Sequence, residues 1–154
     1  MLTRREMMKS LGIGSAAFGS MMLAGLAAAA ETAQTQAAPS LGTGVTMKKL
    51  FDYPLEEVKD ANAVVVRFDF APGAASAPHR HPGSAIGYVL SGRVEIQVAP
   101  GAVGSYRQGE LWYAPPHALH RVSRNLSTTA PASILFFMLV PKGKPFLLPA
   151  SEPA

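Results

Sequence analysis

The sequence contains no cysteine, which excludes disulfide bonds and thiolate metal ligands. Charged residues are scarce at 16% of the chain, aromatic residues make up 8%, and there is a single tryptophan. No basic stripe with interleaved aromatic residues is present, which argues against nucleic acid as a partner. Nucleophile-elbow motifs, phosphate-binding loops and paired carboxylates are also missing. The chain therefore lacks the usual sequence marks of nucleotide-binding proteins and of hydrolases with a serine nucleophile.

Histidine is scarce too, but all four histidines fall in two clusters rich in proline and glycine. The first cluster contains His79 and His81, and the second contains His117 and His120. Neutral imidazole is a common ligand for divalent transition metals. Because residues two apart in an extended segment point to the same side, His79 and His81 can face one point. A histidine from a neighbouring strand would complete a metal site; the alternative is four unrelated surface histidines.

Residues 1–30 are typical of a cleaved export signal. Arg4 and Arg5 form a twin-arginine pattern, residues 11–27 form a weakly apolar stretch, and residues 28–30 offer a cleavage site. The alternative is a membrane anchor, but the glycines and serines of the apolar stretch make it a poor membrane span. The sequence therefore predicts twin-arginine export to the periplasm or the exterior, with no stable membrane partner after cleavage.

The rest of the chain divides into a linker and one domain. Residues 31–44 lack aromatic side chains and are rich in small and polar residues, so we expect a disordered linker. The domain at residues 45–150 is predicted to consist of short strands, because apolar and polar residues alternate at 64–70 and at 94–98. Residues 134–140 are continuously apolar, as expected of a strand covered on both faces. The 13 prolines and the absence of helical periodicity favour an all-β sandwich or barrel.

The two histidine clusters resemble the two sequence motifs of the cupin family. Gly73, His79, His81 and Gly92 have the spacing of the first motif. Gly109, Pro115 and His120 have the spacing of the second. The resemblance covers about residues 62–140. It implies a double-stranded β-helix, which is a jelly-roll barrel, and one divalent transition metal in its mouth. The implied ligands are His79, His81 and His120.

The chain departs from the family's motifs at three positions. Ala85 holds the place of the glutamate ligand, His117 that of a glycine, and Arg124 that of an asparagine, which follows as Asn125. Without the glutamate, the implied site has three neutral imidazoles, an undiminished divalent charge and open coordination positions. Iron, nickel, copper and zinc accept imidazole, whereas manganese loses a hard oxygen ligand, so the choice among these metals stays open.

Other residues near the motifs carry further expectations. Ala85 and Gly87 share one strand face, where Gly87 either leaves room for a planar substrate or marks a close-packing position. His117 stands where the family has a glycine, which suggests a turn with positive φ. Its side chain lies at the rim of the pocket or beside a ligand, is simply exposed, or is a fourth ligand. Only one of the adjacent Trp112 and Tyr113 can face inward, as core or as part of a pocket.

Three functions are consistent with this pattern. The first is an exported, mononuclear metal-dependent dioxygenase that acts on a small chelating organic molecule, because some cupin dioxygenases are similar in using three histidines. The second is a metal-dependent isomerase or decarboxylase, which the lack of an obvious general base disfavours. The third is a non-enzymatic module that binds metal or a small ligand. Small cupins usually dimerise, so we also expect a homodimer, built through sheet edges or an outer sheet face, with residues 45–60 supplying an extra strand.

Overall fold

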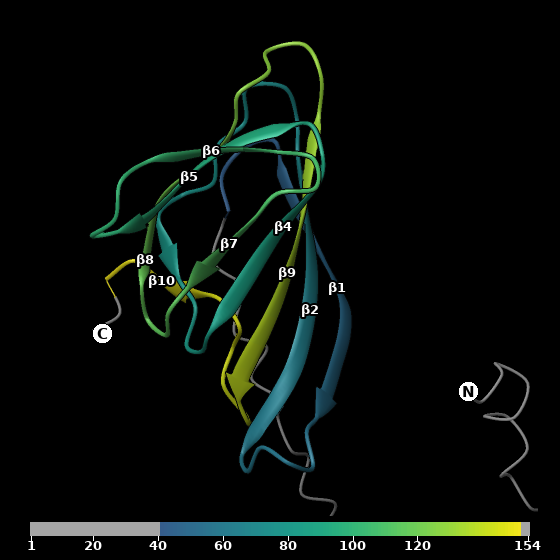
Figure 1. The fold of residues 1–154 in the computed structure, drawn as a ribbon, viewed down its shortest axis with the longest axis vertical. Coiled ribbons are helices and arrows are strands. Elements are labelled where there is room, and N and C mark those ends of the chain that lie inside the picture. The colour runs from purple at the N-terminus through teal and green to yellow at the C-terminus, as the bar shows by residue number, and fades with distance from the viewer. Residues whose placement is uncertain (1–40, 152–154) are drawn as a thin grey trace, which may run out of the picture. The chain divides into compact units, whose positions relative to one another are not determined.

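The computed structural model describes residues 41–151 (Figure 1). The expected export signal and residues 31–40 of the expected linker lie outside these described residues. Leu41 is buried in the hydrophobic core, so the packed domain begins before residue 45. Nowhere between residues 41 and 151 is there a helix that could span a membrane.

The domain consists of two antiparallel sheets of five strands each. The first sheet has the order β1 (Val45–Pro54), β2 (Ala61–Phe70), β9 (Ala132–Pro141), β4 (Ala85–Ser91) and β7 (Leu111–Ala114). The second sheet has the order β10 (Leu148–Pro149), β3 (His79–Arg80), β8 (Leu119–Asn125), β5 (Arg93–Ala99) and β6 (Gly104–Arg107). The long strands β2 and β9 run side by side along the first sheet (Figure 1). This architecture confirms the all-β prediction.

The alternating segments form strands with one buried face, as predicted. On β2, Val64, Val66, Phe68 and Phe70 are buried, and the intervening Arg67 is exposed. On β5, the buried positions are Val94 and Ile96. Burying one such side chain stabilises the fold by about 1.5–3 kcal/mol, so these two strands anchor the core between the sheets.

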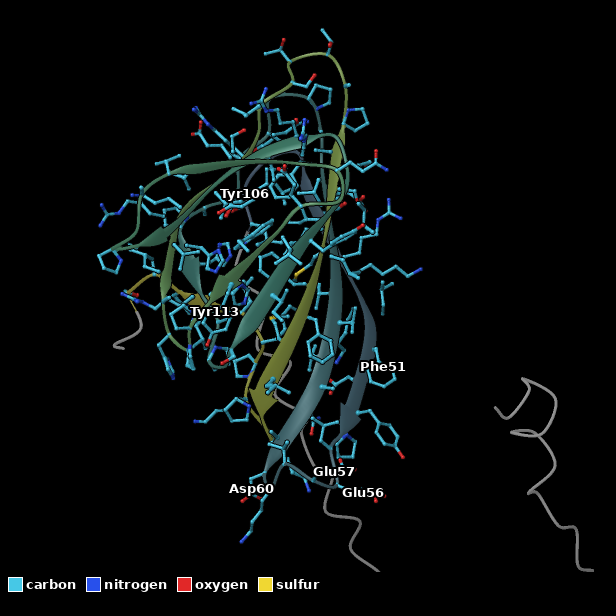
Figure 2. All side chains as sticks on the ribbon, in the orientation of Figure 1. Phe51, Glu56, Glu57, Asp60, Tyr106 and Tyr113 are labelled. Carbon is cyan, nitrogen blue, oxygen red and sulfur yellow. The ribbon has the colours of Figure 1, made fainter. Side chains whose placement is uncertain are left out.

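The prediction that residues 134–140 are covered on both faces is wrong for the described chain. Strand β9 buries Ile134, Phe136, Met138 and Val140 on its inner face, whereas Phe137 on the outer face is 44% exposed. The run is continuously apolar because the outer positions are apolar as well, although no layer of the described domain covers them. Tyr113 of β7, labelled in Figure 2, is also exposed on this sheet.

The β4–β5 turn requires a glycine. Gly92 has a φ of 78°. A Cβ at this position would lie 2.8 Å from the Ala132 side chain and 2.9 Å from the Pro131 carbonyl oxygen. Both the backbone angle and the close neighbour therefore exclude a larger residue, which explains the glycine of the first motif.

Candidate metal centre

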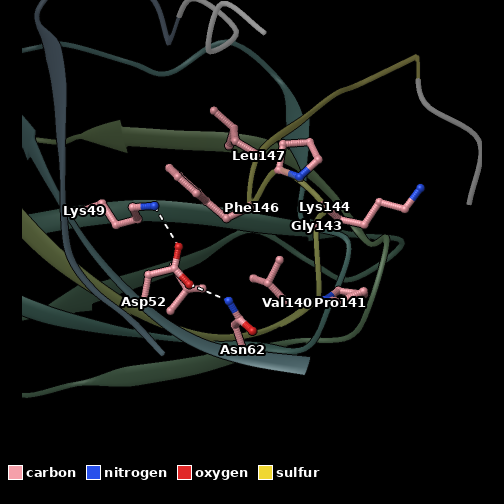
Figure 3. Close-up of a pocket in the computed structure, with 11 residues that line it drawn as sticks. Lys49, Asp52, Asn62, Val140, Pro141, Gly143, Lys144, Phe146 and Leu147 are labelled. Atoms are coloured by element: carbon pink, nitrogen blue, oxygen red, sulfur yellow. Dashed lines mark hydrogen bonds and ion pairs between the residues drawn. The ribbon is translucent and has the colours of Figure 1, made fainter. Parts of the chain in front are cut away.

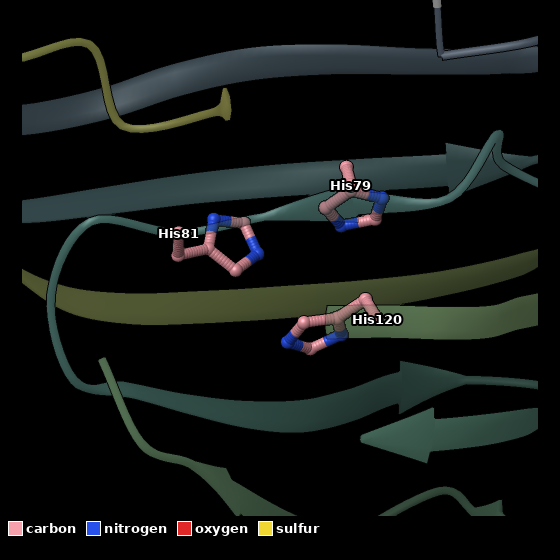
Figure 4. Close-up of side chains that lie close together, drawn as sticks. All are labelled: His79, His81 and His120. Carbon is pink, nitrogen blue, oxygen red and sulfur yellow. The ribbon is translucent and has the colours of Figure 1, made fainter. Parts of the chain in front are cut away.

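The three predicted histidine ligands lie together inside the domain (Figure 4). His79 on β3 is directly opposite His120 on β8, and His81 follows β3. One ring nitrogen from each can be chosen so that all three lie within 4.8 Å of one another. His79 and His81 lie on one side of the chain because they are two residues apart. The antiparallel pairing of β3 with β8 brings His120 next to them.

The cluster is buried and lies against an aromatic side chain. His79 is 6% exposed, and His81 and His120 are each 1% exposed. The Phe136 ring packs against two of the imidazoles, with centroid distances of 5.2 Å to His81 and 5.7 Å to His120. Water is therefore largely excluded, which strengthens electrostatic interactions within the site.

Two backbone carbonyls fix the orientation of two imidazoles. The Nδ1 of His79 donates to the Ala77 carbonyl oxygen at 2.9 Å, and the Nδ1 of His81 donates to that of Phe146 at 2.7 Å. A carbonyl oxygen can only accept, so the proton lies on Nδ1 and the lone pair on Nε2. Metal-binding histidines commonly have this arrangement, because it sets the tautomer and the ring orientation.

The remaining imidazole nitrogens fit a metal ion. Both ring nitrogens of His120 and the Nε2 of His81 are buried and have no hydrogen-bond partner. Leaving a buried polar atom unpaired costs about 1–3 kcal/mol, and coordination to a cation removes this penalty. The donor set is therefore suited to a divalent transition metal that accepts imidazole.

Burial keeps the cluster neutral. Desolvation lowers the pKa of all three histidines. Together with repulsion from the neighbouring histidines, it lowers the pKa of His81 to about 3 and that of His120 to about 2. At neutral pH all three imidazoles are uncharged, which is the form that binds metal.

No carboxylate takes part in the cluster. Ala85, at the position of the family's glutamate, is buried on β4 opposite Met138 of β9 and Ala114 of β7. The group of potential ligand atoms contains only the three histidines. A metal held here would therefore keep its full divalent charge.

The expected room for a planar substrate beside Gly87 is absent. A Cβ at Gly87 would lie 2.2 Å from the Cζ2 atom of Trp112, so the indole fills this space. Gly87 is thus a close-packing position, which is one of the two interpretations of the sequence. Trp112 is the inward member of its pair and is buried in the core, while Tyr113 is 58% exposed.

His117 lies beside the cluster but outside it. It has a φ of 60°, the positive value expected from the glycine position. Its backbone N–H donates to the His81 carbonyl oxygen at 2.8 Å, and its own carbonyl accepts from Arg80 at 2.5 Å. His117 therefore contacts the backbone at His81 and is not in the group of potential ligands.

The C-terminal segment supports the same region. Strand β10 pairs with β3, so that Pro149 lies opposite His79. The Arg80 side chain donates from Nε to the Ala150 carbonyl oxygen at 3.1 Å. Together with the bond from His81 to Phe146, these contacts hold residues 146–150 against β3 and the residue that follows it, which carry His79 and His81.

Asn125, which comes one residue late in the second motif, has a structural role. Its Nδ2 donates to the carbonyl oxygens of Ala71 and Ala130 at 3.1 and 2.8 Å, and its Oδ1 accepts from the Ser127 N–H at 2.9 Å. The preceding Arg124 points outward and pairs with Glu95 at 2.7 Å. The one-residue shift thus places the amide inside and the guanidinium outside.

Sequence reasoning missed a cavity of about 490 Å³, bounded by β1, β2, β9 and residues 143–147 (Figure 3). Its lining includes Lys49, Asp52 and Asn62, and also Phe146, whose carbonyl binds His81. No motif marks these residues, because Asn62 meets Lys49 and Asp52 only through the pairing of β1 with β2. Local spacing within β1 gave no signal of a site.

Comparisons with known proteins agree with the fold. Residues 66–138 match the family described as Cupin domain. A cupin-2 domain from Rhodospirillum rubrum is 19% identical with a TM-score of 0.56, and the match covers 73% of this chain and 70% of that one. A conserved protein with a double-stranded β-helix domain from Klebsiella pneumoniae is 24% identical with a TM-score of 0.52, covering 69% and 85% of the two chains.

A third structure, a cupin superfamily protein from Desulfitobacterium hafniense, is 16% identical with a TM-score of 0.51 and covers 64% of this chain and 80% of its own. No curated protein sequence matches this chain. The predicted double-stranded β-helix is confirmed by these folds and by the two antiparallel sheets. Residues 66–138 are thus similar to a cupin domain, and the three structures share its double-stranded β-helix fold.

Proposed function

We propose that this protein is an exported, mononuclear metal-dependent dioxygenase that acts on a small chelating organic molecule. The observation that carries the proposal is the buried cluster of three neutral imidazoles without a carboxylate. Such a ligand set favours an anionic or enolate substrate, because no protein charge offsets that of the cation. When bound, the metal supplies Lewis acidity and, if it is iron or copper, one-electron redox chemistry.

The chain's own residues provide the environment for this chemistry. His79, His81 and His120 supply the ligand nitrogens, and two of their rings are oriented by backbone carbonyls. Phe136 packs on the cluster and excludes water from it. Ala85 leaves the family's carboxylate position without a charge, and the cavity next to Phe146 is the proposed approach for the substrate.

Metal analysis and oxygen uptake test the proposal. Protein purified from its native compartment is expected to contain one iron, copper or other imidazole-binding ion per chain, and to consume oxygen with a phenol, flavonol or diketone. The His120→Ala variant is the control and is expected to do neither. Oxygen uptake that is equal in the two proteins would contradict the assignment.

Non-enzymatic binding of a metal or small ligand is the second candidate, and the 1% exposure of His81 and His120 favours it. A metal-loaded protein that neither consumes oxygen nor converts any substrate would support it. The isomerase or decarboxylase alternative needs a general base, but the carboxylate in the cavity, Asp52, is held by Lys49 and Asn62. Product formation without oxygen would revive that alternative.

We also propose that the twin-arginine route determines which metal is bound. The ligand nitrogens come from β3, the segment after it and β8, so the site exists only in the folded domain. If the domain folds before export, the site takes its metal from the ions present in the cytoplasm. If affinity alone decided, the site would take copper or zinc. Replacing the signal with one that exports unfolded chains, and measuring the bound metal in both products, tests this. The same metal in both would refute selection by compartment.

A further inference from the structure

Arg80 stands in the chain between two of the three histidines, His79 and His81. Because side chains alternate along an extended segment, its side chain points away from their imidazoles. It is partly buried there and makes two hydrogen bonds. Its Nε donates to the Ala150 carbonyl oxygen at 3.1 Å, and its Nη1 donates to that of His117 at 2.5 Å. One guanidinium thus connects two segments that are far apart in the sequence.

The first carbonyl belongs to the C-terminal segment, residues 146–150. In this segment the Phe146 carbonyl accepts from Nδ1 of His81 at 2.7 Å, which sets the tautomer of that imidazole. The segment pairs with β3 through β10, and each of these strands has only two residues. Such a short ladder supplies few backbone hydrogen bonds. The bond from Arg80 to Ala150 therefore limits how far the segment can move away from β3.

The second carbonyl belongs to the turn that precedes β8. The N–H of His117 in this turn donates to the His81 carbonyl oxygen at 2.8 Å. Strand β8 begins at Leu119 and carries His120. Arg80 therefore links the segment that orients one histidine to the turn that leads to another.

The charge of Arg80 does not explain its place beside the cluster. The ion pairs among residues 41–151 do not include Arg80, so no carboxylate of this part of the chain neutralises it. A positive charge close to a cation site opposes binding of the cation. The hydrogen bonds do offer an explanation, because the planar guanidinium holds its N–H donors in a fixed fork that reaches two acceptors at once. The ammonium of lysine is a single point of charge and cannot replace this fork.

We propose that Arg80 is a positioning residue of the metal centre. By holding Ala150 and the His117 turn, it keeps the Phe146 carbonyl at the Nδ1 of His81. The proton of this imidazole then stays on Nδ1, and the lone pair of Nε2 is directed into the cluster. The inference rests on the metal-binding part of the proposed function and requires no oxygen chemistry.

NMR spectroscopy of the nitrogen-15-labelled full chain, free of metal, tests the effect of Arg80 on His81. A buried, hydrogen-bonded Nδ1–H exchanges slowly with water, so both His79 and His81 are expected to give an imidazole N–H resonance. In Arg80→Met, which keeps an unbranched side chain of similar length, the resonance of His81 is expected to broaden or vanish. The resonance of His79 is the internal reference and is expected to persist, because its acceptor is Ala77 of the same segment.

Titration with cobalt(II) tests the effect on the metal centre, since cobalt accepts imidazole ligands and its visible absorption reports their geometry. Arg80→Met is expected to bind cobalt at least about tenfold more weakly and with an altered absorption spectrum, because losing the groups that orient ligand histidines typically costs about 10–100-fold in affinity. Arg80→Lys is expected to bind no more tightly than Arg80→Met, since lysine keeps the charge but not the fork. If only the charge of Arg80 mattered, Arg80→Met would bind cobalt more tightly than the unaltered protein.

Arg121→Met is the matched control. Arg121 is also an arginine next to a ligand histidine, His120, but it is exposed, and its side chain makes no hydrogen bond or ion pair among residues 41–151. This variant is expected to match the unaltered protein in both experiments. Arg80→Lys provides the same two measurements even if Arg80→Met does not fold.

Two results would overturn the role of Arg80: an unchanged His81 resonance in Arg80→Met, or a cobalt affinity equal to or higher than that of the unaltered protein. Loss of the His79 and His81 resonances together would also overturn it, because that result shows general loosening of the domain. If the unaltered protein binds no divalent metal, the proposed function fails, and the resonances of the metal-free protein still decide whether Arg80 orients His81. Metal binding without oxygen uptake would remove the dioxygenase and leave this inference intact.

Discussion

Two polar regions of this domain, one buried and one partly exposed, are built on opposite principles. In the histidine cluster the groups are neutral, oriented and partly unpaired. In the adjacent cavity the charged groups Lys49 and Asp52 compensate each other, and Asn62 ties into them. The difference teaches that the cluster depends on an added ion to complete its bonding, whereas the polar side of the cavity is largely complete. Perturbing the first should change metal binding and stability greatly, and perturbing the second only slightly.

Removing one ligand histidine has the largest expected effect. Changing His81 to Ala leaves two imidazoles, so bound metal is expected to fall from one ion per chain to none after desalting. The thermal stabilisation by added metal should disappear as well, because a ligand stabilises only the state that binds it. Elemental analysis and thermal unfolding measure the two effects. Full metal occupancy in the His81→Ala protein would show that the cluster is not the metal site.

Acid is expected to destabilise the metal-free protein next most strongly. The unfolded chain protonates its histidines below about pH 6.5, whereas burial lowers the pKa of His81 to about 3 and that of His120 to about 2. Between about pH 6.5 and these lowered pKa values, the unfolded state thus binds more protons than the folded state. The free energy of unfolding should therefore fall as the pH drops below about 6.5, by up to about 1.4 kcal/mol per pH unit for each buried histidine. Denaturant titrations from pH 7 to pH 4.5 measure this fall. The His120→Ala variant is expected to show a shallower slope, and a flat profile would contradict the neutral cluster.

Adding a carboxylate makes the cluster resemble the family pattern more closely. Ala85→Glu is expected to shift metal preference toward manganese and iron, because a carboxylate is a hard, negative ligand. Competitive metal titration of the two proteins measures the shift. Unchanged selectivity would show that position 85 does not face the metal.

The smallest effect is expected in the cavity. Asp52→Asn removes the ion pair with Lys49. Solvent screens this pair, because the side chain of Asp52 is 33% exposed and that of Lys49 is 49% exposed. The free energy of unfolding should change by about 1 kcal/mol or less, and metal affinity should stay the same. Chemical denaturation and metal titration measure both quantities. A large loss of metal affinity would show that the two regions are coupled.

Local sequence patterns predicted the parts of this structure that depend on near neighbours. The alternation on β2 gave its buried face, since side chains alternate along any strand. The spacing of His79 and His81, with the cupin resemblance, brought His120 into the same cluster. The positive φ of His117 followed from its glycine position.

The parts that depend on distant pairing could not be predicted in this way. Apolar character alone does not reveal whether a second layer covers a strand, so the outer face of β9 was misjudged. The space beside Gly87 is filled by Trp112 of another strand. Asp52 and Asn62 meet through a strand pair whose register has a shift between Lys49 and Phe51, and periodicity does not reveal such a shift.

The hydrogen bond between His81 and Phe146 also has a consequence for biosynthesis. The two residues are 65 positions apart in the chain. A ribosome adds about 5–20 residues per second, so the acceptor that orients this imidazole is made roughly three to thirteen seconds after the imidazole itself. During translation the histidines are therefore exposed to cellular ions as unconstrained side chains before they become oriented ligands. The selectivity of the finished centre can act only after this interval.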